Sequence, residues 1–184
     1  MALWGVSDSD ESKPKYLSTA DKKNCIAKPE GWVLKKTVGS RNLEEILVAT
    51  GADLAVGIGQ ADITEIDFVS TAFDKSDGGT IQVRVRFNEE VDVTGTPQLT
   101  VVNDSRANHT LSYASGTGSN ELVFSLTIAA GGGGVIADGD VLSIGANATA
   151  LNGGTIKDKG TNTASTITNV AGVGTAAGTI TAAA

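Results

Sequence analysis

Apolar and polar residues alternate along several short segments of this chain. In the segment 80–87, TIQVRVRF, the residues at 81, 83, 85 and 87 are apolar, and those between them are Gln or Arg. This period of two is typical of a β-strand that buries one face and leaves the other in water. Together with short apolar runs, the pattern predicts about six to eight strands. They fall in the segments 63–69, 80–87, 98–102, 111–113, 122–128 and 141–148.

Glycine-rich stretches separate these predicted strands. Such stretches favour tight turns, because Gly adopts backbone conformations that other residues avoid. One-sided strands joined by Gly turns, without a helix-length amphipathic segment, predict an all-β fold: an immunoglobulin-like antiparallel β-sandwich, in which two stacked sheets bury the apolar faces. After Thr161 we expect either a frayed tail or a last edge strand completed by another chain. The turns lie at 77–79, 94–97, 115–119, 130–134, 138–140 and 152–154.

Residues 1–60 show no such periodicity. Pro14 and Pro29 interrupt the segment, and its one concentrated apolar run is 46–49. So few anchors predict an extended N-terminal arm with little regular structure, with a short helix from Ser40 to Thr50. A flexible tail is the alternative. Two Trp and one Tyr favour instead an arm that becomes ordered when it docks on a neighbouring subunit.

Charge supports the same division of the chain. Of its 184 residues, the first 60 hold eight basic and eight acidic side chains, whereas residues 61–184 hold six basic and thirteen acidic ones. We therefore expect a docking arm at 1–60 and a β-sandwich with a low-complexity C-terminal strand or tail at 61–184. The net charge of −7 argues against nucleic-acid binding, which needs clustered Lys and Arg. No apolar stretch approaches the roughly 20 residues that span a bilayer, so no membrane partner is expected.

Side chains that could carry catalysis are few. His109 and Cys25 are the single His and Cys, and no Gly-x-Ser-x-Gly motif occurs, so we expect no enzyme and a His at the surface or at a strand edge. Glu89, Glu90 and Asp92 could supply the carboxylates of a glycosidase, but acids that follow a strand are expected to form a solvated turn. Calcium held by loop carboxylates is an alternative to turn-forming Asp, although none fits a known calcium loop. We predict no metal and no cofactor. The loop carboxylates considered are Asp74, Asp77, Asp138, Asp140 and Asp158.

The second part of the chain resembles a known repeat. The stretches VRVRFNEEVDV, TGTPQLT, YASGTGSNELVF and ALNGGTIKD, in this order, are similar to an immunoglobulin-like repeat of large bacterial surface proteins. The resemblance covers roughly residues 62–165. It implies a β-sandwich that serves as a structural or adhesive module and has no catalytic chemistry.

The first part resembles a different family. Within residues 1–50, the stretches ALWG, SKPKYL, PEGWV and EEILVA are similar to the amino-terminal segment of virion structural proteins in tailed phages of marine cyanobacteria. This resemblance implies a virion component whose arm binds the particle while the sandwich projects outward.

Together the resemblances imply a non-enzymatic capsid decoration protein on the virion surface. Its expected partners are the major capsid protein or other virion subunits, and we expect a homo-oligomer, for which analogy with decoration proteins suggests a trimer. The alternative is an adhesion module on the tail or head that binds host surface glycans weakly, although Tyr113 is the one aromatic residue near a predicted loop.

Aromatic and apolar side chains of the arm are expected to carry the binding energy, because such residues dominate the centres of interfaces. Packing within their own subunit is the alternative left open. These residues are Trp4, Tyr16, Trp32, Leu34, Ile46 and Leu47.

Overall fold

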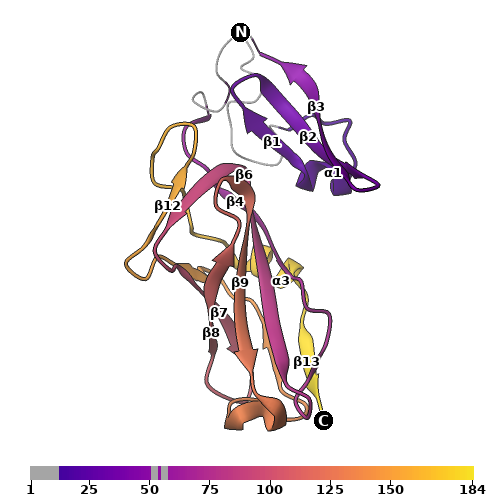
Figure 1. Ribbon diagram of the computed structural model, residues 1–184, viewed down its shortest axis with the longest axis vertical. Coiled ribbons are helices and arrows are strands. Elements are labelled where there is room, and N and C mark those ends of the chain that lie inside the picture. The colour runs from indigo at the N-terminus through magenta and orange to yellow at the C-terminus, as the bar shows by residue number, and fades with distance from the viewer. Residues whose placement is uncertain (1–12, 51–53, 55–57) are drawn as a thin grey trace.

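The computed structural model describes residues 13–50, 54 and 58–184, and its two β-sheets lie one beyond the other along the long axis of the molecule (Figure 1). The expectation of a mostly β fold is confirmed. No helix among the described residues is long and apolar enough to cross a bilayer. The described helices are short: α1 (Thr19–Lys23), the 3-10 helix η2 (Ala130–Gly134) and α3 (Ala171–Ala176).

Residues 13–60, where described, form the small unit. It contains a three-stranded antiparallel sheet in the order β1-β2-β3, made of β1 (Cys25–Lys28), β2 (Gly31–Val38) and β3 (Arg41–Ala49). The two-residue turn at Gly39 and Ser40 joins β2 to β3, and the φ of 62° at Gly39 is one that Gly adopts without strain. One face of the sheet buries a compact cluster of Cys25, Ala27, Trp32, Leu34 and Leu54.

Two predictions for this part of the chain were wrong. Residues 25–49 are regular β-structure and not an arm with little regular structure, and the segment from Ser40 to Thr50 contains β3 and not a helix. The pairing with β2 explains the difference, because it places Lys35 opposite Glu44 and Val33 opposite Ile46. These opposite-charge and apolar pairs stabilise a hairpin. Neither strand by itself shows a strict alternation of apolar and polar residues.

Residues 61–184 form the large unit. Its ten strands make one strongly curled mixed sheet, in the order β12-β6-β9-β8-β7-β10-β13-β5, while β4 pairs with β6 and β11 with β7. All pairings are antiparallel except that of β13 with β5. The strands are β4 (Ile63–Phe68), β5 (Phe73–Asp74), β6 (Gly79–Thr94), β7 (Gln98–Asn103), β8 (His109–Ser115), β9 (Ser119–Ile128), β10 (Val141–Ser143), β11 (Thr149–Ala150), β12 (Thr155–Asp158) and β13 (Ile180–Ala183).

The predicted alternation of buried and exposed residues is confirmed in β6. Ile81, Val83 and Val85 are fully buried in the core of the large unit, while Gln82 and Arg84 between them are half-buried on the outer face. The strand is longer than the pattern indicated. It runs on to Thr94, through an irregularity between Arg86 and Val91 in its pairing with β9.

The C-terminal segment is part of the curled sheet. β13 lies between β10, with which it is antiparallel, and β5, with which it is parallel. Ile180 and Ala182 are buried in the core, whereas the residues between and after them point outward. The expectation of a frayed tail or of an edge strand completed by another chain was therefore wrong.

Candidate functional site

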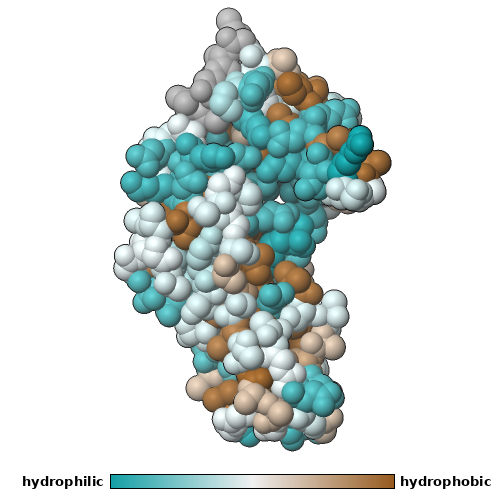
Figure 2. All heavy atoms as spheres, viewed as in Figure 1, coloured by the Kyte–Doolittle hydropathy of each residue, from teal (hydrophilic) through white to brown (hydrophobic). Residues whose placement is uncertain are grey.

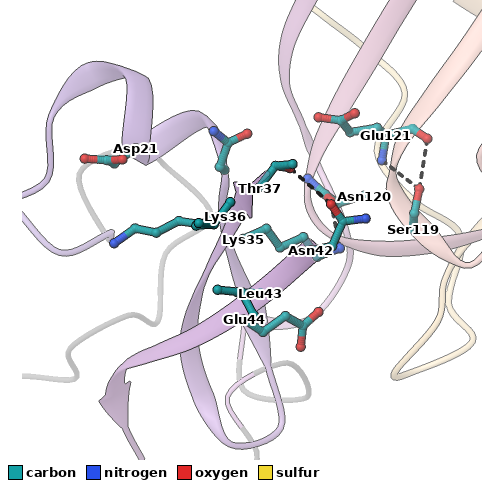
Figure 3. A pocket seen from close by; sticks show the side chains of 12 residues that line it. Asp21, Lys35, Lys36, Thr37, Asn42, Leu43, Glu44, Ser119, Asn120 and Glu121 are labelled. Atoms are coloured by element: carbon teal, nitrogen blue, oxygen red, sulfur yellow. Dashed lines mark hydrogen bonds between the residues drawn. The ribbon is translucent and has the colours of Figure 1, made fainter. Parts of the chain in front are cut away.

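A cleft of about 710 Å³ lies where the β2–β3 hairpin of the small unit faces the start of β9 (Figure 3). The hairpin forms one wall, the first residues of β9 form the other, and α1 closes one end. Val38 and Leu43 are its two apolar lining residues, so a partner in the cleft would be held mainly by hydrogen bonds. The lining residues are Asp21, Asn24, Lys35, Lys36, Thr37, Val38, Asn42, Leu43, Glu44, Ser119, Asn120 and Glu121.

Lysine residues at the cleft already have partners within the chain. The Nζ of Lys35 donates to Oδ1 of Asn120 at 3.1 Å, across the boundary between the units. The Nζ of Lys36 donates to Glu45 at 2.8 Å. The lining residues include neither His nor Cys, and no hydroxyl among them contacts a base that could activate it. This arrangement of hydrogen-bonding side chains can bind a polar surface.

Glu90 is the centre of a charge cluster that joins the two units. Its carboxylate lies 3.5 Å from the Nζ of Lys28, 3.3 Å from that of Lys35 and 3.0 Å from that of Lys159. Partial burial alone would raise the pKa of Glu90. The hydrogen bond from Lys159 and the charges of Lys35 and Lys28 outweigh it and hold the pKa below the ordinary value of a glutamate.

A second charge cluster lies beside α1. Glu65 of β4 receives hydrogen bonds from Lys23 of α1 and from Arg86 of β6. Arg86 also donates to Glu121 of β9 at 2.7 Å. Burial acts to raise the pKa of Glu65, but the two cationic donors lower it overall. Because Lys23 belongs to the small unit and the other members to the large unit, this cluster is a second connection between the two sheets.

We expect Glu90→Gln to loosen the junction between the units. The substitution keeps the shape of the side chain but removes the negative charge that three lysines face. Amide hydrogen exchange at Lys35 and Asn120 should become several-fold faster. Glu30→Gln is the matched control, because Glu30 is exposed and makes no ion pair within the described part of the chain. Equal exchange in both variants would show that the cluster does not hold the units together.

The same cluster predicts how the junction depends on pH. The pKa of Glu90 is lower in the folded protein than in the unfolded chain, so its stabilising contribution is complete above the unfolded value of about 4.3. That contribution is lost as the pH falls through the lowered folded value. Wild-type exchange at the junction should therefore approach that of Glu90→Gln in acid.

Of the residues expected to bind a partner, some are buried in the small unit and others are exposed. Trp32 and Leu34 are 1% and 2% exposed and form the core of the small unit, and Leu47 packs against that core. Tyr16 and Ile46, in contrast, are 69% and 56% exposed. Trp4 lies outside the described residues.

Two exposed apolar residues were missed in the sequence. Val38 and Leu43 are 60% and 49% exposed and lie near the tip of the β2–β3 hairpin. The available signal was the Gly39-Ser40 turn, which could have identified the hairpin and the strand edge that carries Leu43.

His109 begins β8 but is buried, so the expectation of a His at the surface was wrong. Its Nε2 lies 3.3 Å from Nδ2 of Asn103, and that amide donates to Oδ2 of Asp140 at 3.0 Å. Burial lowers the pKa of His109 despite the opposing charge of Asp140. Asp140 also accepts the backbone N–H of Ala137 and contacts Arg106. The imidazole therefore belongs to a structural network that connects the end of β7, the start of β8 and the loop before β10.

The other acidic candidates fall into two groups: three residues of β6, and the carboxylates that were predicted to lie in loops. Glu89, Glu90 and Asp92 belong to β6, and Glu89 is 2% exposed, so the expectation of a solvated turn was wrong. Among the loop carboxylates, Asp74 and Asp158 accept backbone N–H groups two and three residues ahead, as turn-forming Asp does. Asp77 and Asp138 are exposed. Among the described residues, no three or more His, Cys, Asp or Glu side chains are grouped to hold a metal ion.

Tyr113, considered above for sugar binding, has both its ring and its hydroxyl engaged. The ring lies edge-on to Phe124, with 6.1 Å between the centroids, and the hydroxyl accepts the N–H of Thr117 at 2.8 Å. A sugar platform needs an open ring face with polar groups around it, and this arrangement does not favour one.

Comparisons of the chain with protein-family models, curated proteins and solved structures found no match.

Proposed function

We propose that this chain is a non-enzymatic structural protein of a phage virion that docks on the capsid through its small unit. One observation carries the proposal: four large apolar side chains of the small unit, Tyr16, Val38, Leu43 and Ile46, are between 49% and 69% exposed. Apolar residues are visible on the β3 side of the small unit in Figure 2. Val38 and Leu43 lie together near the hairpin tip, and exposed apolar groups that gather in this way are typical of protein–protein contact sites.

The two resemblances supply the biological setting of this proposal. The similarity within residues 1–50 to virion proteins of cyanobacterial phages assigns the docking role to the small unit. The similarity of residues 62–165 to an immunoglobulin-like repeat makes the curled sheet a projecting structural module. The acidic surplus of residues 61–184 would reduce adhesion between particles.

The proposed mechanism is stabilisation by binding. A protein that binds only the assembled shell shifts the equilibrium toward assembly by mass action. Tyr16 and Ile46 would contribute most per residue, because aromatic and large aliphatic side chains gain most when they leave water.

Co-sedimentation with empty capsids that lack this protein tests the proposal. Ile46→Asp should weaken capsid binding at least about tenfold, because it places a charge in an apolar contact. Val170→Asp is the matched control, since Val170 is 72% exposed but lies on the large unit. It should bind as the wild type does.

Two results would contradict the proposal. The wild-type chain would fail to co-sediment at saturating concentration, or Ile46→Asp and Val170→Asp would bind equally well. The first result would favour attachment to the tail or to a host surface.

A further inference from the structure

β3 is an edge strand of the small sheet. The sheet order is β1-β2-β3, so within the described part of the chain no other strand pairs with the outer side of β3. The opposite edge, β1, lies against β6 of the large unit. β3 has nine residues, most of them exposed. A long exposed edge strand presents unpaired backbone groups that can bind a further strand.

The hydrogen bonds of β2 show which backbone groups of β3 are free for such pairing. The N–H of Lys35 donates to the carbonyl of Asn24, toward β1. Successive residues of a strand point their backbone groups to opposite edges, so Lys36 points toward β3, where it pairs with Leu43. Leu43 therefore uses its backbone groups within the hairpin. Asn42 and Glu44 direct theirs to the open edge.

The side chains of β3 along this edge are arranged so that they complement those of an antiparallel second copy. Leu43 is 49% exposed, and Arg41 and Glu45 lie two residues before and after it, on the same face of β3. Within the described residues Arg41 makes no ion pair, whereas Glu45 contacts Lys36 and remains 56% exposed. A strand with opposite charges at equal distances from an apolar centre fits an antiparallel copy of itself.

We propose that a second copy of this chain pairs with the open edge of β3, antiparallel, about a two-fold axis at Leu43. The two Leu43 side chains then face each other, and each Arg41 faces the second copy's Glu45. Asn42 of each copy exchanges backbone hydrogen bonds with the second copy's Glu44. The result is one six-stranded sheet across two small units.

The charges select this register over its neighbours. In an antiparallel pair, the residues whose backbone groups point to the shared edge must face each other. The two-fold axis must therefore pass through a residue that faces the same residue of the second copy. Moving the axis to Glu44 or Glu45 would place two carboxylates directly opposite each other, which is destabilising. Moving it to Asn42 would shorten the paired segment toward the Gly39 turn and separate Arg41 from Glu45.

Sedimentation velocity of the full chain between about 1 µM and 1 mM tests the dimer. The wild type should dimerise within this range. Arg41→Glu and Glu45→Arg should each weaken dimerisation about tenfold, because each turns two attractive pairs into repulsive ones. The double variant R41E/E45R should recover the wild-type affinity. A merely structural effect of either substitution would not be reversed by the other.

Disulfide formation tests the register. Facing residues of a pair that shares no backbone hydrogen bonds lie close enough for a disulfide, so Leu43→Cys should give a covalent dimer under mild oxidation. Asn42→Cys is the matched control, because in this register each residue 42 faces residue 44 and lies too far from its own copy. The native Cys25 is fully buried and is present in both variants.

Three results would overturn the inference: a wild type that is monomeric up to 1 mM, a double variant no better than the single ones, or equal crosslinking of the two cysteine variants. Dimerisation is measured without capsids, so its failure would leave the proposed docking function standing. Failure of capsid binding would likewise not affect the dimer.

Discussion

Gly31→Ala is expected to unfold the small sheet while the large sheet stays folded. Gly31 begins β2 with a φ of 135°, and a Cβ added there would lie 1.9 Å from the carbonyl oxygen of Val48. Val48 cannot move away, because it pairs with Trp32 in the same sheet. The strained φ and the backbone clash together should cost about 3 kcal/mol or more. This loss is large for a unit whose described core cluster has five buried residues.

Gly39→Ala is the control for this prediction. Gly39 also has a positive φ, 62°, but an added Cβ would meet no atom within 4 Å. It should therefore cost only about 1 kcal/mol. Fluorescence of the buried Trp32, in a Trp4→Phe background, reports unfolding of the small sheet in urea. Equal midpoints for the two variants would show that the small sheet tolerates the clash by rearrangement. Loss of the sheet should also abolish capsid binding if the proposed docking function is right.

Several strands of the large unit could be predicted from sequence because their buried and exposed residues alternate, whereas their arrangement in one curled mixed sheet could not. From Ile81 to Val85 in β6, each buried residue is apolar and each residue between them is polar, so the period identifies both the strand and its buried face. The alternation that identifies a strand is contained within the sequence of that strand.

The small sheet could not be predicted in the same way. Its strands are joined by ion pairs such as Lys28 with Glu44 and Lys36 with Glu45, which are visible only once the strands are aligned. Lysine and glutamate are common in helices and loops, so neither strand shows a β pattern by itself. The same limit applies to the site. The carboxylate of Glu90 meets lysines from β1, β2 and the segment after β12, and no local pattern joins these positions.

His109 shows why burial of a polar residue is hard to predict. In the sequence it follows a turn and begins a strand, as a surface residue would. In the structure, the side-chain amide of Asn103 at the end of β7 lies within hydrogen-bond distance of the imidazole. The charge of Asp140, just before β10, also acts on the ring, and together they make its burial tolerable. The deciding partners are six and thirty-one residues away along the chain, so their contribution depends on the completed fold.

Phe124→Ala is expected to destabilise both units. Phe124 is fully buried in β9, between β6 and β8, and its ring packs edge-on against Tyr113. Removing it should cost about 3–5 kcal/mol, because the cavity left in a close-packed core cannot collapse completely. Phe68→Ala on β4 is the control. Phe68 is only partly buried at the edge of the same core, so the same substitution should cost markedly less.

The small unit is expected to unfold together with the large one in Phe124→Ala. Twenty-one buried residues form the core cluster of the large unit, against five in that of the small one, so the small unit is marginal without its neighbour. Glu90 and Glu65 transmit this support, because Lys28 and Lys35, which contact Glu90, and Lys23, which contacts Glu65, belong to the small unit. Far-ultraviolet circular dichroism and Trp32 fluorescence should therefore shift to the same lower midpoint. A Trp32 midpoint equal to that of the wild type would show that the small unit is stable by itself. Gly31→Ala should behave in the opposite way and lower the Trp32 midpoint alone, so the two variants together establish which unit supports the other.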